Sequence, residues 1–156
     1  MSVDDGSVEV GRPAPEFSLR DQHNVFVGPA DFPGRAVLVV FYPLAFTGVC
    51  SGELDALQSE LEAFQNDRVQ LLAVSVDSPY TLRVFADQQG FKFPMLSDFW
   101  PHGKVAQSFG VFNDEVGVAT RGTFLIDAGG IVRWKVVNDI PHARDQAEYH
   151  KAIAAL

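Results

Sequence analysis

Hydrophobic residues dominate two runs near the middle of the chain, separated by a segment in which they recur every three or four positions. The runs AVLVVFY (36–42) and VQLLAVSV (69–76) are rich in β-branched and aromatic residues, as is typical of strands buried on both faces of a sheet. Between the runs, the apolar residues at helical spacing are Leu54, Leu57, Leu61 and Phe64. This stripe predicts a helix that begins near Thr47 or Gly48, and the order strand, helix, strand predicts a parallel pair.

Two further helices are predicted after the second run. Ser78 has the position of an N-cap, Pro79 that of a first helical residue and Gly90 that of a stop, which together bound one helix. Residues 143–156 have the composition of a helix that closes the chain.

Two segments have the spacing of antiparallel hairpins. TFLID and IVRWKVV flank the turn residues 128–130, and the apolar residues of FSLRDQHNVFV lie on either side of the turn-forming residues 21–24. Parallel strands with helical crossovers and these hairpins predict an α/β fold, with a mixed central sheet, helices on both faces and an N-terminal β-hairpin. A thioredoxin-like sandwich is the simplest fold of this kind.

Length and charge limit the domain count and the classes of partner. The chain has 156 residues, 47% of them hydrophobic, which is enough for one core. Residues 1–9 are acidic and lack periodicity, so they are predicted to form a flexible tail before a single domain over 10–156. A net charge of -8 opposes binding to nucleic acid and to anionic membrane surfaces, and neither partner is expected.

The chain contains one cysteine, Cys50, and therefore cannot form an internal disulfide. A reducing compartment fits this count, and the first thirty residues lack a signal pattern, so we expect a cytoplasmic protein. No paired Cys/His or carboxylate spacing and no Gly-rich phosphate loop is present, so neither a metal nor a dissociable cofactor is expected.

Cys50 falls just after the first buried run, in the first turn of the helix that follows, with Thr47 placed to cap that helix. The unpaired amides and the dipole at a helix N-terminus favour a thiolate. A cysteine that only filled the core would fall within a strand or on the leucine stripe. Cys50 instead has Thr47, Gly48, Ser51 and Gly52 around it, an exposed type of junction, which favours a reactive thiol.

The segment PLAFTGVC resembles the active-site motif of the peroxiredoxin family. Pro43, Thr47 and Cys50 match the proline, threonine and peroxidatic cysteine of that motif in type and spacing. Arg121 in TRGTFLID is similar to the arginine that peroxiredoxins bring to the cysteine from a later strand, and Glu53 resembles an acid one turn beyond the cysteine. The resemblance extends from Val10 to the C-terminal helix.

Residues 93–103, FPMLSDFWPHG, are similar to the one-cysteine alkyl hydroperoxide reductase E group of that family. The resemblance implies a thioredoxin-like fold and a peroxidase that reduces hydrogen peroxide and organic hydroperoxides to water or alcohol through a Cys50 sulfenic acid. Without a resolving cysteine, recycling needs an external reductant: a low-molecular-weight thiol, or a glutaredoxin-, mycoredoxin- or thioredoxin-like protein. The resemblance also suggests a homodimer.

Each residue type suits peroxide chemistry. Arg121 can stabilise both the thiolate and the charge that develops on the leaving oxygen. The hydroxyl of Thr47 can accept a hydrogen bond from the peroxide while donating toward sulfur, and Pro43 can end the strand and shape one wall of the site. Glu53 can fix Arg121, although a solvated surface role is nearly as compatible with its position.

Two other functions fit parts of the pattern. A cysteine hydrolase would need a histidine oriented by an acid, for which His102 with Asp98 or Asp139 are the candidates. A noncatalytic redox sensor would need only slow oxidation of the thiol. Four aromatic residues could form an apolar collar for organic peroxides or serve as core or subunit contacts: Phe46, Phe99, Trp100 and Phe112.

Overall fold

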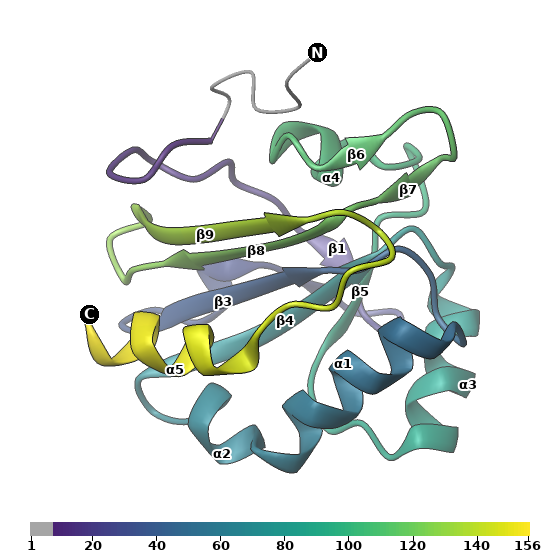
Figure 1. The fold of residues 1–156 in the computed structure, drawn as a ribbon, viewed down its shortest axis with the longest axis horizontal. Coiled ribbons are helices and arrows are strands. Elements are labelled where there is room, and N and C mark those ends of the chain that lie inside the picture. The colour runs from purple at the N-terminus through teal and green to yellow at the C-terminus, as the bar shows by residue number, and fades with distance from the viewer. Residues whose placement is uncertain (1–7) are drawn as a thin grey trace.

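A computed structural model describes residues 8–156, and within this range the centre of the protein is a seven-stranded mixed sheet in the order β2-β1-β5-β4-β3-β8-β9 (Figure 1). The strands of this sheet are β1 (Leu19–Arg20), β2 (Phe26–Val27), β3 (Ala36–Phe41), β4 (Val69–Ser75), β5 (Met95–Ser97), β8 (Arg121–Ile126) and β9 (Val132–Asn138). A separate antiparallel pair consists of β6 (Phe112–Asn113) and β7 (Val118–Ala119). Residues 1–7 of the expected tail lie outside the described residues, and Val8 is buried.

The strand pairing agrees with the expected α/β architecture. β3, β4 and β5 are parallel, with Val39 opposite Leu72 in β4. β8 runs antiparallel to β3 and places Phe124 opposite Val39, and β9 returns beside β8 through the turn at 128–130. β1 and β2 form the N-terminal hairpin and attach to β5 at the other edge. Both predicted hairpins and the parallel pair are therefore confirmed.

The helices in the described part of the chain are η1 (Pro29–Asp31), α1 (Gly48–Ser59), α2 (Leu61–Phe64), α3 (Pro79–Gln89), α4 (Lys104–Ser108) and α5 (Gln146–Ala154). The bounds of α3 confirm its predicted caps: the Ser78 hydroxyl accepts from the Thr81 amide, and Gly90 has a left-handed φ of 75°. None of these helices is long and apolar enough to cross a membrane.

The single helix predicted along the leucine stripe is wrong at Glu60, where it breaks into α1 and α2. The φ and ψ of Glu60 are −120° and 31°, outside the helical region. Its carboxylate accepts a hydrogen bond from Gln146 Nε2 at 2.7 Å and lies 3.2 Å from His150 Nε2, both on α5. The break turns the chain toward α5, and the apolar stripe still packs on one face of the sheet.

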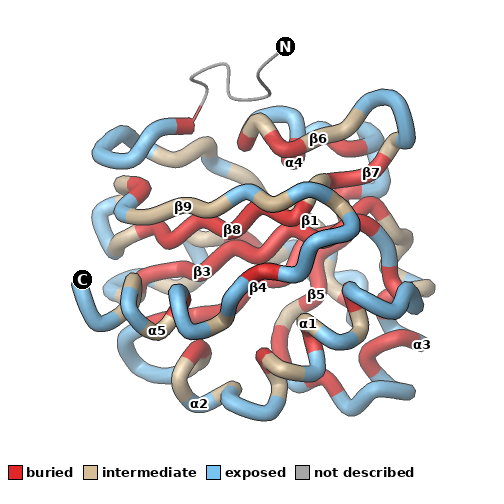
Figure 2. The backbone as a smooth tube through the Cα atoms, viewed as in Figure 1, coloured by how far each residue is buried: buried red, intermediate tan, exposed pale blue. Residues whose placement is uncertain are grey.

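The central strands β3, β4 and β8 are buried (Figure 2), and the apolar layers on the two faces of the sheet both include residues of β3. Leu38, Val40 and Tyr42 pack under α1, α2, α3 and α5, whereas Val37, Val39 and Phe41 pack on the side of α4 and the N-terminal segment. This alternation is the period-two pattern of a strand buried on both faces. The C-terminal end of β3 consequently delivers the chain to the start of α1, where Cys50 lies.

Candidate active site

The thiol of Cys50 is buried in the first turn of α1. Cys50 is 0% exposed and belongs to the apolar layer that includes Tyr42 and Leu54. The residues just before it, 46–49, are exposed. The expectation of an exposed junction therefore holds for the surrounding backbone and is wrong for the thiol, because α1 turns the Cys50 side chain inward onto β3 and β8.

Arg121 lies beside this thiol. It is the first residue of β8 and is 2% exposed. Its Nη1 donates to Cys50 Sγ at 3.3 Å and to Glu53 Oε1 at 2.7 Å, and its Nε donates to the Ile140 carbonyl. The guanidinium is fixed through two of its nitrogens, Nε and Nη1, so a permanent positive charge is held against the sulfur.

Glu53 connects Arg121 to a second buried arginine, Arg144, which sequence reasoning missed. Glu53 Oε1 accepts from Arg144 Nη2 at 2.8 Å, and Oε2 accepts from Arg144 Nε at 3.0 Å and from its backbone amide at 2.7 Å. Arg144 Nη1 also donates to the carbonyls of Phe41 and Gly122. Arg144 lies in an otherwise polar segment, and no local pattern distinguishes it from a surface arginine.

Burial alone would raise the pKa of Glu53, but the hydrogen bonds and charge of Arg144, followed by the charge of Arg121, outweigh burial and hold its pKa below the usual value. The carboxylate is thus ionised at neutral pH between two guanidinium groups. Glu53 thus lies in contact with both Arg121 and Arg144, and its burial does not fit the alternative of a solvated surface residue.

Replacing Glu53 by Gln should lower the free energy of unfolding by about 3 kcal/mol at neutral pH, because two buried guanidinium groups lose their counter-charge. Since the folded pKa of Glu53 is depressed, its contribution is present above the unfolded pKa of about 4.3 and is lost as pH falls through the folded pKa. The difference between wild type and Glu53→Gln should therefore shrink as pH falls below about 4.

Urea unfolding at several pH values measures this difference. The control is Glu148→Gln, which removes a carboxylate that lies in an exposed pair with Lys151. A deficit of the Glu53→Gln variant that stayed constant from neutral to acidic pH would contradict the assigned charge network.

Thr47 and Pro43 lie in the loop between β3 and α1. Thr47 occupies the N-cap position by its backbone, with φ −91° and ψ 152°, and its carbonyl accepts from the Ser51 amide. The side-chain cap expected from the sequence is absent, because the Thr47 hydroxyl donates to the Leu44 carbonyl at 2.8 Å instead of accepting from the helix. Pro43 is buried two residues after the end of β3, where its missing amide proton costs no ladder bond.

The histidine required by a hydrolase does not lie at the thiol. The ring of His102 bonds the Gly117 carbonyl through Nε2 at 2.7 Å and packs edge-on against Phe112. Asp98 accepts from two amides at the start of α4, and burial raises its pKa. Within residues 8–156, the side chain that forms a hydrogen bond with the Cys50 thiol is that of Arg121.

The four aromatic residues considered for a collar do not form one group. Phe46 is half exposed and packs on Phe85 of α3, with ring centroids 4.8 Å apart. Phe99 and Trp100 are exposed and line a different hollow of about 560 Å³ with Tyr80 and Phe26 at the ends of β4 and β5. Only Phe46 therefore lies in the segment that precedes Cys50.

Tyr42 precedes Pro43 and has a fully buried hydroxyl that lies beside Ser75 but makes no hydrogen bond of good geometry in the described part of the chain. Burial raises the pKa of this phenol far above its ordinary value, so the group is neutral. Tyr42→Phe should therefore raise the free energy of unfolding by about 1 kcal/mol, since it removes a buried polar group whose desolvation Ser75 compensates only weakly. Urea unfolding measures the change, and a loss of stability would show that the hydroxyl has a stabilising partner.

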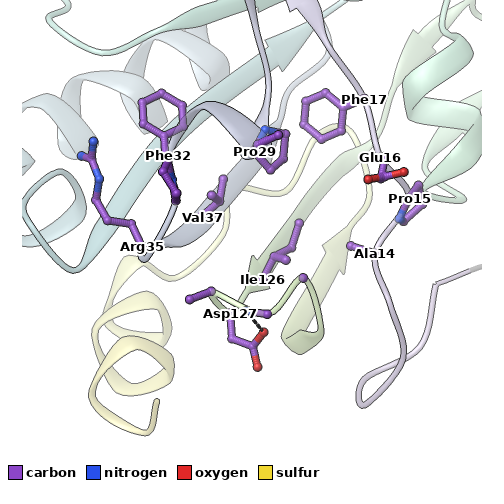
Figure 3. Close-up of a pocket in the computed structure, with 15 residues that line it drawn as sticks. Ala14, Pro15, Glu16, Phe17, Pro29, Phe32, Arg35, Val37, Ile126 and Asp127 are labelled. Atoms are coloured by element: carbon purple, nitrogen blue, oxygen red, sulfur yellow. Dashed lines mark hydrogen bonds between the residues drawn. The ribbon is translucent and has the colours of Figure 1, made fainter.

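A pocket of about 330 Å³ lies at the opposite end of the sheet from Cys50 (Figure 3). Its floor includes Val37 at the start of β3 and Ile126 at the end of β8, whereas the thiol lies near the end of β3 and the start of β8. Pro29 and Phe17 supply further apolar walls. Its position separates this pocket from the chemistry of Cys50 and Arg121.

Metal chemistry has no donor set in the described residues, because no three His, Cys, Asp or Glu side chains are grouped to hold an ion between residues 8 and 156. The arrangement at Cys50 is instead a buried thiol, a fixed guanidinium and a carboxylate that orients it. This set can stabilise an anionic sulfur nucleophile and negative charge that develops beside it.

Comparison with known proteins agrees with this chemistry. Residues 10–135 match the model of the AhpC/TSA family. The chain is 49% identical over 150 residues to alkyl hydroperoxide reductase E of Mycobacterium tuberculosis, covering 96% of this chain and 98% of that protein. It is 36% identical over 152 residues to peroxiredoxin tpx1 of Schizosaccharomyces pombe, covering 91% of this chain and 78% of that protein.

Solved structures give the same result for the fold. A reduced 2-Cys peroxiredoxin of Plasmodium vivax superposes with a TM-score of 0.83 at 35% identity, covering 94% of this chain and 80% of that one. Peroxidoxin BcpB of Mycobacterium tuberculosis superposes with a TM-score of 0.84 at 25% identity, covering 96% of this chain and 98% of that one. The fold is thioredoxin-like, as the order of elements predicted. Together with the sequence matches, these likenesses show that the chain belongs to the AhpC/TSA family of peroxiredoxins, in the group that resembles alkyl hydroperoxide reductase E.

Proposed function

We propose that this protein reduces hydrogen peroxide and organic hydroperoxides with Cys50 as the attacking group. The observation that carries the proposal is the 3.3 Å hydrogen bond from Arg121 Nη1 to Cys50 Sγ, made by a nitrogen that Glu53 holds at 2.7 Å. A fixed positive charge favours the thiolate, which is the nucleophilic form of cysteine. The same charge lies where a leaving oxygen can be stabilised during attack.

The reaction has two stages. The thiolate attacks one peroxide oxygen, a sulfur–oxygen bond forms as the oxygen–oxygen bond breaks, and the leaving oxygen takes a proton to become water or alcohol. Cys50 is thereby oxidised by two electrons to a sulfenic acid. An external thiol then attacks that sulfur and releases water, leaving a mixed disulfide. A second thiol attacks the external sulfur of this disulfide, which restores Cys50 as a thiol and releases the oxidised reductant.

Thr47 and Pro43 are proposed to align the peroxide rather than to change its electronic properties. The Thr47 hydroxyl uses its proton in the bond to the Leu44 carbonyl, so its lone pairs remain to accept from a peroxide hydroxyl. Donation from Thr47 toward sulfur would require the hydroxyl to rotate away from Leu44. Pro43 is proposed as a wall of the site, and its lack of an amide proton avoids competition for the thiolate.

The reductant is proposed to come from outside the chain, because Cys50 is the one cysteine in 156 residues. A low-molecular-weight thiol or a glutaredoxin-, mycoredoxin- or thioredoxin-like protein has the required chemistry. We also propose that residues 10–156 act as one domain, that the protein forms a homodimer, and that it works in the cytoplasm. The absence of any internal disulfide supports a reducing compartment.

A turnover assay tests the proposed function. Reduced protein is supplied with an excess of dithiothreitol and either hydrogen peroxide or cumene hydroperoxide, and loss of peroxide is followed with loss of thiol. Catalytic amounts of protein should consume many equivalents of each peroxide, with two thiols oxidised for each peroxide reduced. Oxidation that stopped after one equivalent per Cys50 would favour the redox sensor, and thioester hydrolysis without peroxide turnover would favour the hydrolase.

A further inference from the structure

Asp77 holds the loop that precedes Cys50. It lies 32 residues after Ala45, the loop residue that it contacts. It follows the C-terminal end of β4, and its Oδ2 accepts from the Ala45 amide at 2.8 Å. The same oxygen accepts from the Ser75 hydroxyl at 2.6 Å. Ala45 is the middle residue of loop 43–47, so one carboxylate oxygen ties this loop to the sheet.

Residues at the ends of two strands hold Asp77 in position. The Ser75 hydroxyl, at the end of β4, donates to the carboxylate and also accepts from the Asp77 amide at 3.3 Å. The Ser97 hydroxyl, at the end of β5, donates to the Asp77 carbonyl at 2.6 Å. Asp77 is consequently held in place by Ser75 and Ser97 of the sheet. It can therefore serve as a fixed anchor for the loop.

The loop itself has a conformation that needs such support. Phe46 has a φ of 67°, a left-handed value that is unfavourable for a bulky side chain. Strained backbone of this kind persists only where surrounding contacts determine it. Three contacts hold it here: the Ala45 amide on Asp77, the Phe46 ring on Phe85, and the Thr47 hydroxyl on the Leu44 carbonyl. Of these, the bond to Asp77 is the one with a charged acceptor.

Two features of the site depend on where this loop lies. Thr47, at its end, sets the start of α1 through the bond from the Ser51 amide to its carbonyl. The thiol of Cys50, one turn later, is completely buried although residues 46–49 are exposed. Ala45 and Cys50 belong to the same buried apolar cluster, so a loop that relaxed from the strained conformation would move the Thr47 hydroxyl and open the cluster around the sulfur.

We propose that Asp77 is a positioning residue for peroxide reduction: its carboxylate holds loop 43–47 in the strained conformation that places Thr47 at the start of α1 and covers Cys50. The proposal rests on the proposed function for its effect on peroxide, and its effect on thiol access is independent of that function. Asp77 does not touch the sulfur and takes no part in bond breaking.

Asp77→Ala removes the acceptor of both hydrogen bonds, so two rates of Cys50 should change in opposite directions. The rate constant for oxidation by hydrogen peroxide should fall about 10- to 100-fold, because small displacements of an aligning group have effects of this size. The rate of alkylation by iodoacetamide, which needs access and no alignment by Thr47, should rise about tenfold, as expected for loss of a hydrogen bond to a charged group. General destabilisation would also expose the thiol and disorder the site, so both rates are compared under conditions in which urea unfolding shows the variant to be fully folded.

Asp77→Asn is the conservative variant, because its amide oxygen can accept from both Ala45 and Ser75. It should restore most of the wild-type behaviour in both reactions. Asp87→Ala, which removes an exposed carboxylate from α3, is the control and should match wild type. If Asp77→Ala does not fold, Ser75→Ala removes one of the two bonds and should give smaller changes in the same directions.

The two rates also separate this proposal from the proposed function. Wild-type Cys50 that is alkylated by iodoacetamide but does not react with hydrogen peroxide would overturn the proposed function. Wild-type protein that reduces peroxide, together with Asp77→Ala protein that matches it in both rates, would overturn the role of Asp77. Parallel falls in both rates would also overturn it, since the loop would then not cover the thiol.

Discussion

Cys50→Ser should have no measurable peroxide reductase activity and an unchanged fold. A serine hydroxyl keeps the shape of the side chain and can still accept from Arg121, but it is not ionised at neutral pH and does not form a stable oxidised product with peroxide. Removing the nucleophile of a covalent mechanism removes both stages of the reaction. Peroxide consumption with dithiothreitol as reductant measures the loss, and circular dichroism checks the fold.

The control for this variant is Ser51→Ala, which changes the neighbouring residue of the same helical turn and leaves the thiol in place. It should retain turnover. Peroxide turnover by folded Cys50→Ser protein would show that another group attacks the substrate, and the mechanism built on this thiol would have to be abandoned.

Arg121→Lys should slow oxidation of Cys50 by hydrogen peroxide about 10²- to 10³-fold, the usual loss on removing a fixed donor to developing negative charge. The guanidinium bonds Cys50, Glu53 and the Ile140 carbonyl at once. A lysine has a single nitrogen on a flexible stem and cannot keep this planar arrangement, although it retains the positive charge. Stopped-flow mixing of reduced protein with peroxide, followed by intrinsic fluorescence or by thiol titration, measures the rate.

The matched control is Arg133→Lys. Arg133 lies on β9 and forms a partly exposed ion pair with Asp127 in the preceding turn. This variant should react with peroxide as wild type does. An Arg121→Lys rate within about threefold of wild type would mean that charge alone, without the fixed geometry, accounts for the role of Arg121.

Most of the fold could be predicted from short-range patterns. The strand β3 is a continuous apolar run and β4 a mainly apolar one, and α3 has a serine cap, a proline at its first position and a glycine stop, each of which acts within a few residues. The hairpins follow in the same way from turn residues. These signals are local because the backbone conformations that they favour are local.

The features that the sequence did not predict depend on distant contacts. Arg144 meets Glu53 across 91 residues of chain, and nothing in the segment around Arg144 indicates burial. The break at Glu60 accompanies contacts to α5, and the short α4, β6 and β7 have too few residues for a periodic signal. The burial of the Cys50 thiol likewise follows from how α1 packs, which the polar residues around it do not show.

The candidate site shows the same division. Cys50, Arg121 and Glu53 could be brought together from the sequence because motif spacing and family resemblance supplied the long-range pairing. The bond of the Thr47 hydroxyl to Leu44 and the contact of Asp77 with Ala45 could not, since each depends on the conformation of one loop. Sequence therefore supplied the groups that we propose to carry the chemistry, and the structure adds how their side chains are held.

The most direct measurement of the central claim is non-reducing mass spectrometry of the intact protein after one equivalent of hydrogen peroxide, followed by one equivalent of a small thiol. Peroxide should add one oxygen atom at Cys50, and the thiol should convert this sulfenic acid to a mixed disulfide at the same residue. Peptide mapping assigns both changes to Cys50. A protein that gained no oxygen, or that formed mainly a disulfide between the Cys50 residues of two chains, would contradict peroxide reduction with an external thiol as the resolving partner.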